Sequence, residues 1–163
     1  MRNPTVPKRR CDTANPRPTF ADPRWTDEIQ QDLCTNHHNP CVGSILASET
    51  GRVRVWHLHL PPGTRCSFHR HVLDYFWTCH SHGAARGYFE DGRVIDVVHF
   101  PGQTKHMSYG EGEYLLHSVE NIGETDLLFT TVEFKNCANA PIELPADVCR
   151  PLQPRDTPQS VGC

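Results

Sequence analysis

Two histidines one residue apart, His69 and His71, are the side chains best placed to do chemistry in this sequence. On an extended chain, residues i and i+2 point to the same side, so both imidazoles can reach one ion. Neutral imidazole is a common ligand of zinc, iron, nickel and copper. His117, in a later strand-like run, is the predicted third ligand, and His106 is the alternative.

The residues around these histidines resemble the two motifs of the cupin superfamily. The first motif, G(x)5HxH(x)3–4E(x)6G, is matched by Gly63, His69, His71 and, near its end, Gly83. The second motif ends in H(x)3N and is matched by His117 and Asn121, but its preceding PxGxx part is not matched. The stretches RVRVW, PPG and HRHVLDYFW further resemble the small single-domain cupins labelled β-alanine degradation proteins.

This resemblance covers about residues 42–135 and implies an all-β fold, the double-stranded β-helix or jelly-roll barrel. It implies one divalent transition metal per subunit, with Fe(II) as the first expectation and Zn, Ni, Mn or Cu as alternatives. It also implies a small-molecule substrate or ligand and a homodimer. Pairing of two subunits would cover exposed sheet edges.

The sequence departs from the first motif where the family has a glutamate. That position falls on Tyr75 or Phe76, and Asp74 is one residue early, on the opposite face of an unbroken strand. The remaining set is therefore a three-histidine site, which leaves coordination positions open for substrate. Tyr75 shares its parity with Trp77 and is the candidate for proton transfer or orientation.

The function expected from this pattern is that of a mononuclear non-haem metal enzyme, foremost a dioxygenase. The same residues suit a metal-assisted lyase or isomerase, and a non-catalytic cupin that binds a small ligand or a structural metal is a further alternative. Two arginines could hold a substrate carboxylate in a bidentate fork. The candidate substrate-binding residues are Arg65, Trp77, Arg86 and His106.

Local patterns predict one short helix followed by many short strands. Asp22 as N-cap and Pro23 at the first position begin the helix, whose apolar face is Trp25, Ile29 and Leu33 and which ends near Asn36. The strand candidates are 53–60, 75–80, 88–95 with an Asp-Gly hairpin signal, 97–100, 114–120 and 127–134. Short strands at such spacing favour a sandwich or a barrel.

These patterns divide the chain into four parts. We expect an extended or disordered arm over 1–20, a helix and linker over 21–41, the barrel over 42–135 and a proline-rich tail over 136–163. A second HxH pair, His57 and His59, alternates with apolar Trp56, Leu58 and Leu60, so we expect it to face solvent or a second subunit.

Composition narrows the class of protein. The chain has 163 residues, a net charge of −3 and no run of 18 apolar residues, which argues against a nucleic-acid binder and a membrane span. The eight cysteines include no CxxC pair, so we expect free thiols rather than a zinc ribbon. Together these features indicate a soluble, cytoplasmic domain.

Overall fold

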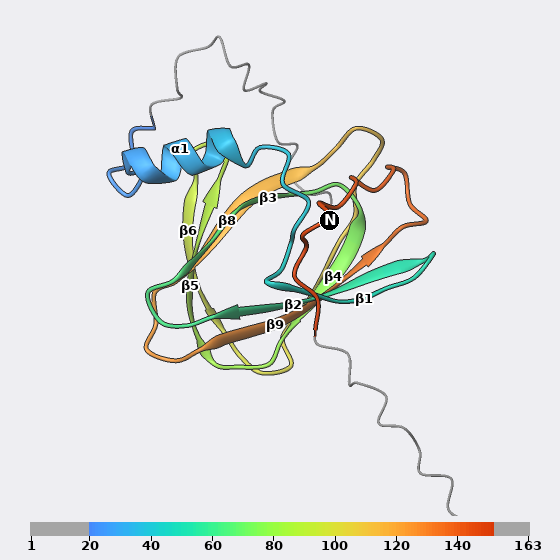
Figure 1. The fold of residues 1–163 in the computed structure, drawn as a ribbon. Helices are drawn as coiled ribbons and strands as arrows, with labels where there is room; N and C mark the ends of the chain where they lie inside the picture. Colours follow the sequence, from blue (N-terminus) through green and yellow to red (C-terminus); the bar gives the residue numbers. More distant parts are fainter. Residues whose placement is uncertain (1–19, 152–163) are drawn as a thin grey trace, which may run out of the picture.

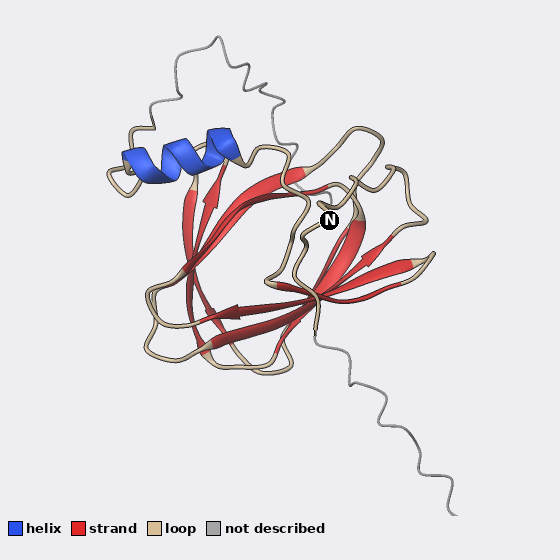
Figure 2. Cartoon of the chain, viewed as in Figure 1, coloured by secondary structure: helices blue, strands red, loops and turns tan. Residues whose placement is uncertain are grey.

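A computed structural model describes residues 20–151 of the chain (Figure 1). In this part, strands form two antiparallel sheets that wrap into a double-stranded β-helix, and one helix lies outside the barrel (Figure 2). The expected all-β fold is therefore confirmed. Almost all of the predicted N-terminal arm and the last residues of the predicted tail lie outside the described residues.

The two sheets are antiparallel throughout. The first has the order β1 (Ile45–Glu49), β2 (Val53–Leu60), β9 (Leu127–Phe134), β4 (Asp74–Cys79) and β7 (Thr104–Met107). The second has the order β3 (Arg65–His71), β8 (Leu115–Asn121), β5 (Gly83–Phe89) and β6 (Val94–His99). In this part of the chain, β1, β7, β3 and β6 are thus edge strands.

The strands predicted from alternation are largely confirmed. β2 and β9 have the predicted bounds and pair along their whole length. Asp91-Gly92 forms the predicted hairpin between β5 and β6, with Gly92 at a φ of 91°. The predicted boundary between the runs 88–95 and 97–100 is wrong, because residues 94–99 form the single strand β6. The short polar strand β7 was not predicted.

The predicted start of the helix is wrong by several residues. Helix α1 spans Asp27–Thr35, and its N-cap is Thr26, whose hydroxyl accepts the Ile29 N–H. Asp22 instead accepts hydrogen bonds from the backbone and guanidinium of Arg24, which closes a turn before the helix. The helix ends at Asn36 as expected.

Helix α1 covers the outer face of the β3–β8–β5–β6 sheet (Figure 1). Its predicted apolar face packs there in one buried cluster, which comprises Trp25, Ile29, Leu33, Phe68, Tyr88 and Leu116. Among residues 20–151 no helix has both the length and the apolar character that a membrane span requires. The six cysteines in this range are free thiols, as predicted.

A β-bulge in β3 decides which side chains of this strand enter the barrel. The register with β8 shifts between Cys66, opposite Val119, and His69, opposite His117. Cys66 packs in an interior cluster, Phe68 packs under the helix, and His69 again faces inward. The bulge therefore switches the parity of the strand just before the two histidines.

Candidate metal centre

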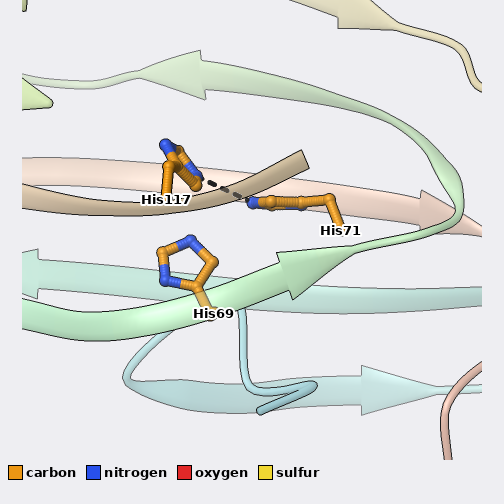
Figure 3. Close-up of side chains that lie close together, drawn as sticks. All are labelled: His69, His71 and His117. Carbon is orange, nitrogen blue, oxygen red and sulfur yellow. Dashed lines mark hydrogen bonds between the residues drawn. The ribbon is translucent and has the colours of Figure 1, made fainter. Parts of the chain in front are cut away.

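Three histidines converge on the inner face of the second sheet. His69 and His71 come from β3, and His117, the direct cross-strand partner of His69, comes from β8 (Figure 3). Their candidate ligand nitrogens all lie within 4.8 Å of one another, and the Nε2 atoms of His71 and His117 are 3.1 Å apart. The sequence therefore predicted correctly which histidines meet, and metal binding by them stays a prediction.

Burial holds all three imidazoles in the neutral form. Desolvation lowers the pKa of His69 to about 4. It also holds the pKa values of His71 and His117 well below the ordinary range, with the neighbouring histidines and, for His117, the charge of Lys105 as further causes. A metal ligand must present an unprotonated nitrogen, so these three groups are in the state that binding requires.

The hydrogen bonds of the three rings fit a divalent transition metal. The Nδ1 of His69 lies 2.9 Å from the carbonyl oxygen of Ser67, which can only accept, so this nitrogen carries the proton and Nε2 is free. The buried Nδ1 of His71 has no hydrogen-bond partner in the described part of the chain. With the proton of each ring on Nδ1, the facing Nε2 atoms of His71 and His117 would both offer a lone pair, which an ion would satisfy better than the two rings satisfy each other.

The position of the absent motif glutamate is occupied by a phenol. Tyr75 is 3% exposed, and its ring stacks on His71 with centroids 4.2 Å apart. Burial raises the pKa of Tyr75 far above its ordinary value, so the hydroxyl is a hydrogen-bond donor rather than a base. Asp74 turns away and accepts the backbone N–H of Tyr109, as its parity predicted.

The histidines open onto a cavity of about 730 Å³ inside the barrel. Trp77, predicted to bind substrate, lines it beside His69, His71, His117 and Tyr75. Most of the remaining wall is apolar, and its larger side chains are Leu58, Phe89, Ile95, Val97, Met107, Leu115, Val119 and Phe129. Such a chamber, with few polar groups beside a ligand set, is typical of small-molecule sites.

Three other candidate residues lie outside this cavity. Arg65 points to the helix side, where it donates to Asp32 at 2.6 Å and to Ser118. Arg86 forms a two-bond ion pair with Asp96 on the barrel exterior. His106 is exposed and packs on Phe76, away from the three-histidine cluster. Each of the two arginines thus binds a carboxylate of the protein itself, where the sequence analysis expected the carboxylate of a substrate.

Other residues of the cavity were missed by the sequence patterns. Lys105 and Met107 belong to β7, and His99 ends β6. Glu90 also lines the cavity, and burial raises its pKa to about 7. For two of these residues the sequence did hold a signal. If residues 104–107 are recognised as a strand, the period of two places Lys105 and Met107 on the same face.

Comparisons with known proteins establish the fold. No protein-family model and no curated protein matches the chain. Among solved structures, a cupin domain from Bordetella pertussis Tohama I is 22% identical with a TM-score of 0.50, over 60% of this chain and 96% of that chain. A double-stranded β-helix protein from Klebsiella pneumoniae is 24% identical with a TM-score of 0.45, over 63% and 86% of the two chains.

At these levels of identity the likeness extends to the fold alone. The solved structures are cupin-domain proteins, which agrees with the double-stranded β-helix described above. The narrower resemblance to β-alanine degradation proteins finds no support in these comparisons. Activity must therefore be argued from the site.

Proposed function

We propose that this chain is a metal-dependent enzyme that acts on a small organic molecule inside the barrel. One divalent transition metal per subunit would be held by His69, His71 and His117. The convergence of three neutral imidazoles, two of them buried and that of His117 half-buried, on the wall of a cavity of about 730 Å³ carries this proposal. When bound, such an ion supplies Lewis acidity and a template for the reacting groups.

The chain's own residues would bind and orient the substrate. The apolar part of the wall would displace water from the bound substrate and so strengthen its polar contacts in the cavity. The Tyr75 ring stacks on His71, and its hydroxyl is a donor that would hold an oxygen atom of the substrate. Trp77 offers a ring face or edge to an apolar part of that molecule.

Within this class we propose a dioxygenase that uses Fe(II). Three neutral ligands and no carboxylate leave several coordination positions for a chelating substrate and O2. The same residues could serve a lyase or an isomerase with zinc, manganese or nickel, because affinity alone does not select the metal. Oxygen consumption separates these reactions.

The first test is the metal content of the purified full chain, measured by mass spectrometry after reconstitution with Fe(II) or Zn(II). We expect about one ion per chain, lost in His69→Ala and in His117→Ala. The matched controls are His57→Ala and His59→Ala, which change an HxH pair on the exposed outer face of β2. Metal-free native protein, or equal occupancy in all four variants, would overturn the proposed centre.

The second test is anaerobic loading with Fe(II) followed by oxygen-electrode measurements with a panel of small organic acids and phenols. Oxygen uptake that depends on both substrate and iron supports the dioxygenase. Turnover of a panel member without oxygen uptake would assign a lyase or isomerase instead. A loaded protein that binds panel members and converts none of them would contradict the proposal of an enzyme.

A further inference from the structure

Strand β7 places one positive charge on the lining of the cavity, at the exposed residue Lys105. Its register with β4 pairs Lys105 with Trp77, and both residues line the cavity. The alternate residues of β7 lie on the other face, where the Thr104 hydroxyl bonds that of Thr78 at 2.8 Å. The period of two along the strand therefore separates an outer row from an inner row to which Lys105 belongs.

Lys105 has no ion-pair partner within residues 20–151. The other cation that lines the cavity, Arg93, is held 2.6 Å from Asp91 and lies over the Phe89 ring. Lys105 is thus the one cation of this lining, among the described residues, that is free to meet an anion from outside.

Three carboxyl groups also line the cavity, those of Glu90, Glu111 and Glu113. Glu90 is buried and accepts the Tyr114 hydroxyl. Glu113 accepts the Gly110 N–H within the β7–β8 loop, and Glu111 is exposed on the same loop. None of them lies within ion-pair distance of Lys105 in the described structure.

Aromatic and aliphatic side chains line the same cavity as Lys105. Trp77, His99 and Phe129 form three mutually perpendicular rings with centroids 5.0 to 5.6 Å apart. Val97 and Ile95 add an aliphatic wall from β6. A ligand that fills this part of the cavity would place an apolar body against these side chains and a negative group at the ammonium.

We propose that Lys105 selects the ligand of this cavity, and that the ligand is an organic anion with an apolar, preferably aromatic, body. This inference rests on the proposed function for its site, because both place a small molecule in the same cavity. It names the class of that molecule as a carboxylate or comparable acid. Lys105 is a specificity-determining residue here, since its ammonium would contact the bound acid directly.

Lysine on an edge strand has another known use, which is to prevent edge-to-edge pairing of sheets. β7 is an edge strand, so this use competes with ligand recognition. The two roles differ in what removal of the charge changes. Loss of recognition lowers the affinity for acids only, whereas loss of protection promotes self-association and leaves the affinity unchanged.

The experiment is calorimetric titration of the full chain with 2-naphthoate and with its neutral isostere 2-naphthamide. The variants are Lys105→Met and the charge-conserving Lys105→Arg. The matched control is Lys135→Met, which removes a lysine paired with Glu49 outside the cavity. We expect the wild type and Lys105→Arg to prefer the acid by about tenfold or more, and Lys105→Met to lose that preference with the amide affinity unchanged.

Any of three results would overturn the proposal. They are equal affinity of the wild type for acid and amide, no binding of the acid, and an unchanged preference in Lys105→Met. In the last case, self-association of the variant in sedimentation experiments would assign Lys105 to edge protection.

Titrations repeated on His69→Ala separate this inference from the proposed metal centre. A preference for the acid that persists in that variant and depends on Lys105 supports the inference even if no metal binds. Normal metal content in Lys105→Met together with an unchanged preference would refute the inference and leave the metal centre standing.

Discussion

Asp32 on helix α1 should control both the stability of the barrel and the geometry of the histidine pair. One of its carboxylate oxygens accepts the Arg65 guanidinium at 2.6 Å and the backbone N–H of Phe68, in the β-bulge, at 3.0 Å. The Arg65 and Asp32 side chains are only 18% and 13% exposed. We expect Asp32→Ala to remove these two charge-assisted hydrogen bonds and a third, which the other carboxylate oxygen accepts from the Asn36 amide at 2.6 Å, at a cost of about 3 to 5 kcal/mol.

The assay is urea unfolding together with the metal affinity of the reconstituted chain. A loss of this size corresponds to a fall in Tm of roughly 8 to 15 °C. Because the bulge sets the inward direction of His69, we also expect a metal affinity about tenfold weaker. Asp32→Asn keeps an acceptor for Phe68 and should lose less. The control is Asp27→Ala, at an exposed position of the same helix.

One result would refute this reasoning. If Asp32→Ala unfolds within about 1 kcal/mol of the wild type, as an ordinary surface substitution does, Asp32 does not hold the bulge. Equal losses in Asp32→Ala and Asp27→Ala would point to a general effect of removing a negative charge from the helix instead of the contact with Phe68, since alanine itself favours the helix.

Three further predictions concern other parts of the fold. Burial raises the pKa of Glu133 from 4.5 to about 7, so the folded state holds a proton that the unfolded state has lost, and stability falls as pH rises through this window. Glu133→Gln, which keeps an acceptor for Trp56, should reduce the fall in Tm between about pH 5 and 8, and an unchanged pH profile would contradict this. Asn121→Ala removes the three side-chain hydrogen bonds of a fully buried residue and should cost about 3 kcal/mol in urea unfolding, whereas Glu124→Ala on the exposed turn that follows should cost under about 0.5. The apolar edge strand β6 would be covered in the expected homodimer, so Val98→Lys should shift sedimentation equilibrium toward monomer, and a monomeric wild type would refute the homodimer.

The barrel and its ligand set could be predicted from the sequence because they depend on local rules. Alternation of apolar and polar residues defined β2 and β9, and Asp91-Gly92 marked the hairpin turn. The HxH spacing placed two imidazoles on one side of a strand, and the later HxxxN run supplied the third. Asn121, the last residue of that run, proves to bond the carbonyl of Leu60 from the adjacent segment.

The direction in which the histidines point could not be predicted from the alternation of residues along the strand. Cys66 already faces the interior, so strict alternation from it would have turned His69 and His71 toward the helix. The bulge reverses this parity, and the N–H of Phe68 within it is bonded to Asp32, 36 residues earlier in the chain. A contact over that separation leaves no trace in the local pattern.

Sequence alone thus determined the fold class, most strand positions and the identity of the three converging histidines, because these follow from a period of two, from turn chemistry and, for the histidines, from the HxH and HxxxN motifs. Tertiary structure decided which charged groups the cavity contains. Arg65 was expected there and is held by Asp32 under the helix, whereas Lys105 was not expected and lines the cavity from a short edge strand. The direction and pairing of a charged side chain depend on partners that only folding brings within reach.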